Sequence, residues 1–523
     1  MNNSLCYIFF ILNILCYYQS LAQPKHEFRG VWVATVDNID FPSTKYLSAH
    51  GQKAEFINLL EMHKRNGMNA VVVQIRPATD AFYPSPYEPW SEWLTGKQGT
   101  PPVPYYDPLE FMITETHIRG MEFHAWMNPY RAVFNTSKSS ISPTHVTKMH
   151  PDWFLDYGGK RYFDPGNKEA QQFVTTVVRD VVSRYSIDAI HFDDYFYPYR
   201  IAGKEFGDAQ SFKKYGKGLD KESWRRSNVD SIIVMLKRVI KQENKYCKFG
   251  ISPFGVWRNI DKDPEGSNTK AGQTNYDDLY ADILLWLKMK WIDYVAPQIY
   301  WEFGQKAVGY EVLIDWWAKH AYGRQMYIGQ GIYRSMESKS YAWKNVNELP
   351  NQIKRLREYP QVQGSIFFSS ASFTSNPNGW SDSLRNNYYR YPAIVPPVLW
   401  IDSIKPSRPV LLFDSMKVRI YSNAIELYMR DDSTVKNLNR YVIYNFEDTG
   451  EINKDDPKNI TEIIVSGNNL YKFDLQKIPQ QQNKIVIAAT ALTSTNNESE
   501  LSRYIYLERK INGWHLIPDE NNR

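Results

Sequence analysis

Short apolar stretches alternate with amphipathic stretches along most of the chain, from residue 28 to about residue 387. Between the apolar stretches, hydrophobic residues recur at helical spacing, as in Phe56, Leu59, Leu60 and His63. The stretches with the length and composition of β-strands are FRGVWVATV, AVVVQIRP, EFHAWMNPY, AIHFDDYF, FGISPFGVW, DYVAPQIYWE, MYIGQGIYR and GSIFFSSASF. Alternating strands and helices predict a parallel sheet, and eight repeats predict an α/β fold closed into a (β/α)8 TIM barrel over residues 27–392.

The connections between these elements have unequal lengths. Helix-to-strand connections are short, such as the one at Arg119-Gly120-Met121. Several strand-to-helix connections are long, namely residues 78–107, 132–166, 198–221 and 258–277. In a (β/α)8 barrel the active site is built from the strand-to-helix loops, so we expect function at the carboxyl ends of the strands.

The pattern changes after Pro396-Pro397. Apolar and polar residues then alternate with a period of two in KVRIYSNAIELYMR, NRYVIYNFED, LYKFDL and NKIVIAATALTS. This alternation predicts a small all-β sandwich of immunoglobulin or fibronectin type III-like size over residues 396–510. The segment NKIVIAATALTSTNNESELS resembles the last strands of a fibronectin type III domain. We expect this module to serve docking, spacing or weak glycan binding.

The amino-terminal residues predict export. The run CYIFFILNILCYY has the length of a signal-peptide core and is too short to span a bilayer. The small residues of SLAQ favour cleavage near Ala22 or Gln23, so residues 1–23 are predicted to be a signal peptide. Cleavage is favoured over a lipid anchor at Cys16, because Leu15 stands where a small residue is expected. We therefore expect a periplasmic, cell-surface or extracellular protein whose mature chain has no transmembrane segment.

Composition narrows the class of partner. The net charge is +5 with 23% charged residues and no dense basic block, which argues against nucleic acid as a partner. The 16 Trp and 37 Tyr residues are suited to a large core and also to stacking on sugar rings. After removal of the signal peptide only Cys247 remains, so no internal disulfide is expected.

Polar side chains gather near the ends of four predicted strands. Because side chains alternate between the two faces of a strand, His191 and Asp193 should point into the barrel and Asp194 should lead onto the loop. The same alternation directs inward Gln74, Arg76, His124, Trp126, Asn128, Gln298, Tyr300 and Glu302. Each of these residues alone is better explained as a hydrogen-bonded core or rim residue. Together they favour a functional site, because buried polar groups without partners cost stability.

The residue types favour acid–base chemistry on glycans. Serine-nucleophile motifs and a Gly-rich phosphate loop are absent, and the first strand lacks the His-x-His pair of metal-dependent hydrolase barrels. We therefore expect no metal and no cofactor. Glycoside hydrolysis uses two carboxyl groups, and adjacent acids such as Asp193 and Asp194 raise one pKa, as a general acid at neutral pH requires.

Several motifs resemble those of the glycosyl hydrolase-like 10 family of bacterial proteins. They are RGVWVATV, QIRPATDAFYPSPYEPWSEWLTGKQG, AWMNPYR, HFDDYFYPY, GISPFGVWRN and YVAPQIYW, in this order between Glu27 and Tyr389. The resemblance implies a (β/α)8 barrel that acts on glycans, with bacterial cell-wall strands as the associated substrate class. The motif positions carried over are Arg76, Asp80, Glu88, Trp90, Asn128, His191, Asp193, Asp194, Tyr195, Gln298 and Trp301.

The sequence thus predicts an exported glycoside hydrolase that cleaves O-glycosidic bonds of an envelope polysaccharide, with peptidoglycan-type strands favoured. Asp193 or Asp194 is expected to supply one catalytic carboxylate, and Glu88 or Glu302 the other. The expected substrate-binding residues are Arg76, Asp80, Trp90, His124, Asn128, His191, Tyr195, Trp257, Gln298, Tyr300 and Trp301. The alternative is a non-catalytic glycan-binding protein with a decayed barrel site. Intact polar groups on several strands favour the enzyme.

Overall fold

The computed structural model describes residues 23–411, 419–421, 423–430, 438–447, 452–465 and 470–517. The predicted signal peptide, apart from Gln23, lies outside these residues. The described chain divides into two compact units, one of residues 28–116 and 122–388, and one that contains residues 23–27, 117–121 and the chain from 389 onward. Within the described residues, no helix is both long enough and apolar enough to cross a bilayer.

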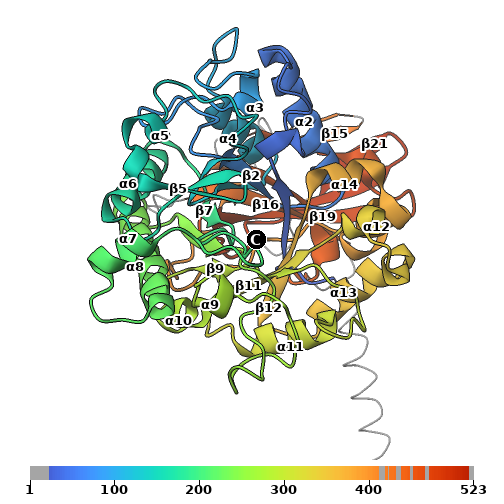
Figure 1. Cartoon of the computed structure of the whole chain (residues 1–523). Helices are drawn as coiled ribbons and strands as arrows, with labels where there is room; N and C mark the ends of the chain where they lie inside the picture. The colour runs from blue at the N-terminus through green and yellow to red at the C-terminus, as the bar shows by residue number, and fades with distance from the viewer. Residues whose placement is uncertain are drawn as a thin grey trace, which may run out of the picture. The chain divides into compact units, whose positions relative to one another are not determined.

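Within residues 28–388, which the structure describes without a gap, eight parallel strands close into a barrel (Figure 1). The strands are β1 (Phe28–Val33), β2 (Ala70–Arg76), β3 (Glu122–Met127), β7 (Ala189–Phe192), β8 (Lys248–Ile251), β9 (Tyr294–Val295) continued by β10 (Gln298–Ile299), β11 (Gln325–Gln330) and β12 (Val362–Phe367). Pairing follows the chain, and β12 returns to β1, where Phe28 lies opposite Gly364. The eight predicted strands and the predicted barrel are confirmed.

Helices follow the strands and surround the barrel (Figure 1). The first, α2 (Ala49–Arg65), begins where the Ser48 side chain accepts a hydrogen bond from the Gly51 N–H, and it buries the predicted face of Phe56, Leu59, Leu60 and His63. The other main helices are α4 (Pro108–Ile118), α6 (Lys168–Arg184), α8 (Lys221–Glu243), α10 (Ile283–Lys288), α11 (Tyr310–Lys319), α13 (Glu348–Leu356), α14 (Ser370–Ser375) and α15 (Trp380–Ser383). Apolar faces at helical spacing thus cover the outside of the barrel.

The long strand-to-helix loops carry short elements of their own. The loop after β3 forms an antiparallel sheet in the order β4 (Arg131–Val133), β6 (Lys160–Phe163), β5 (Phe154–Tyr157). Other elements of these loops are η1 (Val36–Asn38), α3 (Glu92–Thr95), α5 (Val146–Met149), η2 (Pro151–Trp153), α7 (Ala209–Tyr215), α9 (Asn275–Asp278), α12 (Arg334–Glu337) and η3 (Tyr341–Lys344), whereas η4 (Pro377–Gly379) follows α14 and η5 (Leu384–Tyr388) follows α15. These loops lie at the carboxyl ends of the strands, where a barrel builds its site.

The barrel interior contains a hydrogen-bonded column of rings. A Cβ atom at Gly250 would lie 1.9 Å from the Tyr294 ring, so the glycine makes room for that ring inside the barrel. The Tyr294 hydroxyl lies 2.9 Å from Nδ1 of His124 and 2.9 Å from Nδ1 of His191. The core of the barrel is therefore partly polar, and the polar groups of this column are partnered, as burial requires.

The second unit consists of antiparallel strands. In one sheet the strand order is β17 (Ile460–Val465), β16 (Leu438–Glu447), β19 (Lys484–Thr493), β20 (Ile505–Lys510), β21 (Gly513–Ile517). The other strands are β13 (Val410–Leu411), β14 (Arg419–Ile420), β15 (Ala424–Arg430) and β18 (Leu470–Asp474). Two short helices, η6 (Pro457–Asn459) and η7 (Leu475–Lys477), lie between strands. Apolar side chains such as Leu427 and Ile487 join both sets of strands in one core. Beyond residue 510, where the predicted module ends, β21 still pairs with β20.

Candidate active site

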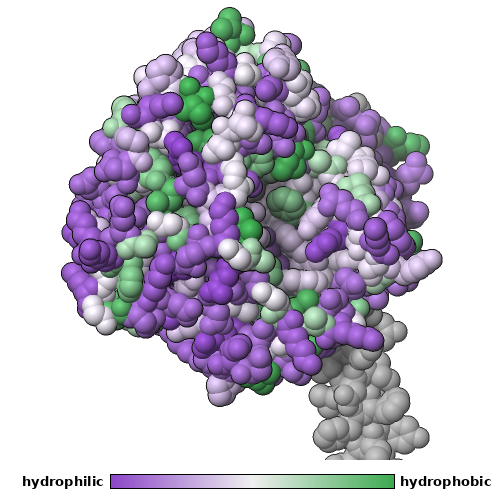
Figure 2. All heavy atoms as spheres, viewed as in Figure 1, coloured by the Kyte–Doolittle hydropathy of each residue, from purple (hydrophilic) through white to green (hydrophobic). Residues whose placement is uncertain are grey.

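The carboxyl ends of the barrel strands surround a cavity of about 420 Å³. The space-filling view shows a hollow in this face of the molecule (Figure 2). Every barrel strand or its following loop contributes a lining residue. The lining residues are Trp32, Ala34, Val36, Ile39, Gln74, Trp126, Arg131, Phe134, Lys160, Asp193, Asp194, Tyr195, Tyr199, Ser252, Phe254, Gln298, Tyr300, Trp301, Tyr333, Arg334 and Phe368.

Asp193 lies directly after β7 and is held by neutral donors. The indole N–H of Trp126 donates to its Oδ2 at 3.1 Å, and the amide of Asn128 lies 3.0 and 3.2 Å from its two oxygens. The backbone N–H of Tyr195 donates to Oδ1 at 3.4 Å. Burial raises the pKa of Asp193, whereas the positive charge of Arg131 and these donors oppose the rise. The carboxylate is therefore fixed in orientation and favoured as an acceptor.

Asp194 is equally buried but has a different environment. Its carboxyl group accepts a hydrogen bond from the Tyr199 hydroxyl. Burial raises the pKa of Asp194 to about 7, and the negative charge of Asp193 contributes to the rise. Among the described residues, no lysine or arginine forms an ion pair with Asp193 or Asp194. Near neutral pH the Asp194 carboxyl group is therefore protonated in a large fraction of molecules.

His191 supports the floor of the cavity. The indole N–H of Trp32 can only donate, so Nε2 of His191, 3.2 Å away, is an acceptor and the ring proton is on Nδ1. That proton is donated to the Tyr294 hydroxyl, which in turn donates to Nδ1 of His124. Burial lowers the pKa of both histidines, so both rings are neutral. His191 and His124 thus fix the floor without facing the cavity.

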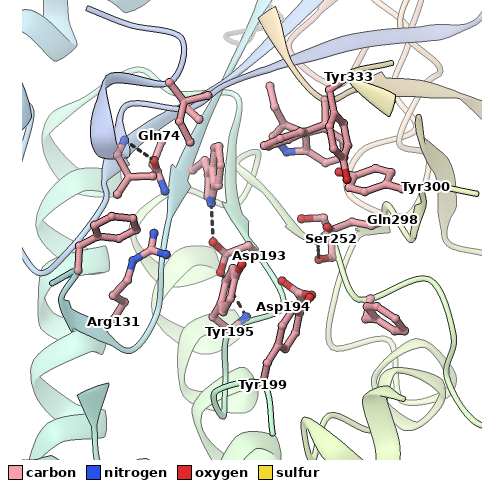
Figure 3. Close-up of a pocket in the computed structure, with 18 of the residues that line it drawn as sticks. Gln74, Arg131, Asp193, Asp194, Tyr195, Tyr199, Ser252, Gln298, Tyr300 and Tyr333 are labelled. Atoms are coloured by element: carbon pink, nitrogen blue, oxygen red, sulfur yellow. Dashed lines mark hydrogen bonds between the residues drawn. The ribbon is translucent and has the colours of Figure 1, made fainter. Parts of the chain in front are cut away.

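The walls of the cavity differ on its two sides (Figure 3). On one side the guanidinium of Arg131 lies 5.4 Å from the centre of the Tyr195 ring, and Lys160 lies 4.7 Å above the Phe134 ring. Gln298 and Tyr300 lie on the other side, and the carboxylates of Asp193 and Asp194 lie between the two walls. This arrangement suits an extended ligand built of linked rings that runs from one wall to the other. The bond between two of its rings would then lie above the carboxylates of Asp193 and Asp194.

Comparison with known proteins identifies the family. The model of the glycosyl hydrolase-like 10 family matches residues 27–344. This chain belongs to that family. Glycosyl hydrolase YngK of Bacillus subtilis (strain 168) is 47% identical over 434 residues, which are 82% of this chain and 84% of that protein. Glycosyl hydrolase DigH of Escherichia coli (strain K12) is 38% identical over 370 residues, which are 66% of this chain and 83% of that protein.

Among solved structures, the glycoside hydrolase domain of PgaB from Bordetella bronchiseptica covers 69% of this chain at 13% identity with a TM-score of 0.42, too distant a likeness to inform function. The family match and the sequence relatives confirm the predicted enzyme class, a glycoside hydrolase.

Six of the predicted site residues line the cavity. They are Asp193, Asp194, Tyr195, Gln298, Tyr300 and Trp301. The remaining nine lie elsewhere: Arg76, Asp80, Glu88, Trp90, His124, Asn128, His191, Trp257 and Glu302. Of these, Asn128 is hydrogen-bonded to the cavity residue Asp193, and His191 is hydrogen-bonded to the cavity residue Trp32.

Glu88 and Arg76 form a buried ion pair. Nε of Arg76 lies 2.9 Å from both carboxylate oxygens of Glu88, and neither side chain is more than 1% exposed. The Nη1 group of Arg76 donates to the backbone oxygen of Asn128 at 2.6 Å. Glu88 therefore lies outside the cavity, where its carboxylate balances the charge of the buried guanidinium of Arg76.

Three other predicted residues have local partners away from the cavity. Glu302 accepts a hydrogen bond from the Trp343 indole at 2.9 Å. Trp257 is buried and stacks on Trp316, with ring centres 5.9 Å apart. Asp80, whose pKa is raised to about 6 by burial, accepts a hydrogen bond from the backbone N–H of Ala78.

Trp90 lies in a separate, shallow depression. Its neighbours there are Pro84, Ser85, Pro86, Pro101, Tyr105, Asp180 and Arg184. The Tyr105 ring meets Trp90 edge-on, with ring centres 6.3 Å apart. This aromatic surface faces solvent rather than the carboxylates.

Sequence reasoning missed several lining residues. Trp32, Arg131 and Tyr199 stand within the motifs RGVWVATV, AWMNPYR and HFDDYFYPY, so those motifs carried a usable signal. Lys160 reaches the cavity from β6, far along the loop after β3. Nothing in the local sequence distinguishes Lys160 from an exposed lysine, because only the pairing of β4 with β6 brings it to the cavity.

Proposed function

We propose that this protein is an exported glycoside hydrolase that cleaves bacterial envelope glycans, with peptidoglycan-type strands as its substrate. The observation that carries the proposal is the pair of consecutive carboxyl groups, Asp193 and Asp194, at the floor of an aromatic-lined cavity at the carboxyl ends of the strands. Glycosidases act through two carboxyl groups that differ in protonation.

Asp194 is the general acid. Its pKa of about 7 keeps it protonated in a large fraction of molecules at neutral pH, so it can give its proton to the oxygen of the departing sugar. Asp193 provides the second carboxyl group, in place of Glu88 and Glu302. Its donors Trp126 and Asn128 and the nearby charge of Arg131 favour the ionised form. Negative charge there stabilises the positive charge that develops at the anomeric carbon.

Two cations support an anionic glycan as substrate. The side chain of Lys160 is half-buried, and within the described residues it forms no ion pair. The Nε group of Arg131 donates to the backbone oxygen of Pro77 at 3.0 Å, and no carboxylate of the described chain pairs with Arg131. Peptide-free peptidoglycan strands carry a lactyl carboxylate on every second sugar, whereas chitin is neutral. A substrate carboxylate bound in this part of the cavity would form ion pairs with these two cations.

The C-terminal unit is proposed to be a fibronectin type III-like sandwich that docks or spaces the enzyme. Its antiparallel strands and the apolar core that they share, which includes Ile425 and Leu507, support this assignment. Export is proposed from the amino-terminal apolar run and the SLAQ cleavage sequence.

The test is release of reducing ends from purified, peptide-free cell-wall strands by the wild-type protein and by Asp194→Asn. We expect release by the wild type and almost none by the variant, whose melting temperature should be no lower than that of the wild type. Strands whose carboxylates have been reduced to alcohols should be cleaved with a higher KM. Lys160→Gln should raise KM for the native strands but not for the reduced ones. Tight binding of strands without any release of reducing ends would instead indicate a glycan-binding protein.

A further inference from the structure

The acidic side chains that line the cavity come from one short segment of the chain, directly after β7. Of the described residues that line it, Asp193 and Asp194 are the acidic ones, and they are consecutive in the chain. Glu88 is neutralised by Arg76, and Glu302 is hydrogen-bonded to Trp343. A glycosidase in which an enzyme carboxylate attacks the sugar needs that carboxylate below the anomeric carbon with a free oxygen, and a second carboxyl group about 5–5.5 Å away.

Both oxygens of Asp193 already accept hydrogen bonds from the protein. Its Oδ1 accepts hydrogen bonds from Asn128 and from the backbone N–H of Tyr195, and its Oδ2 accepts from Asn128 and Trp126. Hydrogen bonds to a carboxylate stabilise its lone pairs and make it a weaker nucleophile, while they fix its orientation. Such a group is suited to accept one further hydrogen bond or to face a positive charge.

The rest of the cavity offers complementary groups for an acetamido substituent. An acetamido group has an N–H that needs an acceptor, a carbonyl oxygen that needs a donor, and a methyl group that needs an apolar surface. Asp193 is the acceptor. Tyr195 and Tyr300 line the cavity, and their hydroxyls have no hydrogen-bond partner within the described residues, while Trp32 and Phe368 add apolar surface.

We propose that the nucleophile is supplied by the substrate, and that Asp193 binds the N–H of a 2-acetamido group whose carbonyl oxygen attacks the anomeric carbon. This inference rests on the proposed glycosidase function and deepens it. The substrate class is a glycan with a 2-acetamido-2-deoxy sugar on the non-reducing side of the cleaved bond. Asp193 is then a catalytic residue that contacts the substrate without bonding covalently to it.

The steps balance in atoms and charge. In the first step the acetamido oxygen forms a bond to C1, the bond from C1 to the glycosidic oxygen breaks, and Asp194 gives its proton to that oxygen. The resulting five-membered ring is an oxazolinium ion, and its N–H⁺ faces the carboxylate of Asp193. In the second step water adds to C1 and gives a proton to the Asp194 carboxylate, while the C1–acetamido oxygen bond breaks. Two inversions at C1 leave the anomeric configuration retained.

The decisive experiment changes only the acyl group of the substrate. Peptide-free cell-wall strands are N-deacetylated and then re-acylated with acetyl, monofluoroacetyl or trifluoroacetyl groups, the re-acetylated strands being the matched control. Fluorine withdraws electrons from the carbonyl oxygen, so we expect kcat/KM to fall with each fluorine added, by about tenfold or more over the series. The thiazoline analogue of the cyclic intermediate should inhibit competitively.

A second measurement asks whether Asp193 bonds to the sugar. If Asp193 were the nucleophile, azide would take its place in Asp193→Ala and yield a glycosyl azide of inverted anomeric configuration, and that product would overturn the proposal, whereas azide that opens the cyclic intermediate gives the retained configuration. Equal rates for all acyl groups would also overturn it, while hydrolysis of the strands would leave the proposed function intact. Failure to cleave even the re-acetylated strands would contradict the proposed function itself.

Discussion

The two ends of the barrel both bury carboxylates, but they compensate them with different partners. At the amino ends of the strands, Glu122 of β3 is fully buried, forms an ion pair with Lys248 of β8, and lies 2.9 Å from Nε2 of His124. At the carboxyl ends, Asp193 and Asp194 are almost as buried, yet tryptophan, asparagine and tyrosine side chains are their hydrogen-bond partners.

This difference separates a structural acid from the acids that we propose to be catalytic. A lysine beside a carboxylate balances its charge, so the pair contributes a fixed element of the core and takes no part in proton transfer. Neutral donors orient a carboxylate without balancing its charge, so burial raises the pKa of Asp194 into the neutral range. In this barrel the chemistry of the partner, rather than burial, indicates which acids serve the reaction.

The largest effect is expected from neutralising the acids at the carboxyl ends. Asp194→Asn keeps the shape of the side chain and removes its proton-donating group, so kcat should fall by about 10²–10⁴-fold. Asp193→Asn should lower kcat by a similar factor. Reducing-end assays and thermal melts check both variants. If both were folded and fully active, the pair would have only a structural role.

At the opposite end, the same kind of substitution should affect stability instead. Glu122→Gln leaves the ammonium group of Lys248 buried without its carboxylate, which should lower the free energy of unfolding by about 3–5 kcal/mol. The control is the double variant Glu122→Gln/Lys248→Met, which removes both charges and should recover much of the loss. Urea denaturation measures both. If Glu122→Gln lost activity while its stability was unchanged, Glu122 would not be a structural acid, and the comparison between the two ends of the barrel would fail.

The pH dependence of stability sharpens the comparison further. Because the folded protein holds the Asp194 proton with a pKa of about 7, against an ordinary value of 3.8, Asp194 opposes folding progressively as pH rises through this interval. Asp194→Asn should therefore raise the melting temperature relative to wild type at pH 8, by an amount equivalent to a few kcal/mol. The difference should shrink toward pH 4. If the difference in melting temperature between the two proteins did not change with pH, folding would not raise the pKa of Asp194.

The smallest effect is expected at the shallow depression away from the carboxylates. Trp90→Ala should change kcat/KM on short glycans only slightly, because Trp90 does not line the cavity. The matched variant Trp301→Ala removes a ring that does line it and should lower kcat/KM by about tenfold, the scale of one aromatic contact. Equal losses in the two variants would extend the binding site to the depression.

The sequence by itself determined the architecture of the catalytic unit and the location of its central acids. Eight strands and their helices follow from periodicity alone, and the alternation of side chains along β7 directs Asp193 toward the interior. Even the sixth strand was found, although Pro297, which lacks an N–H to donate, divides it into β9 and β10. These features depend on residues close together in the chain.

Only the tertiary structure decided which charges meet. Glu88 was a candidate with Glu302 for the second carboxylate until the folded chain paired it with Arg76, and Lys160 entered the cavity only through the antiparallel pairing of β4 with β6. The physical reason is that periodicity fixes the face on which a side chain lies but not its neighbour across space. A carboxylate becomes structural or catalytic according to that neighbour, because an adjacent cation stabilises its charge whereas burial among neutral groups raises its pKa.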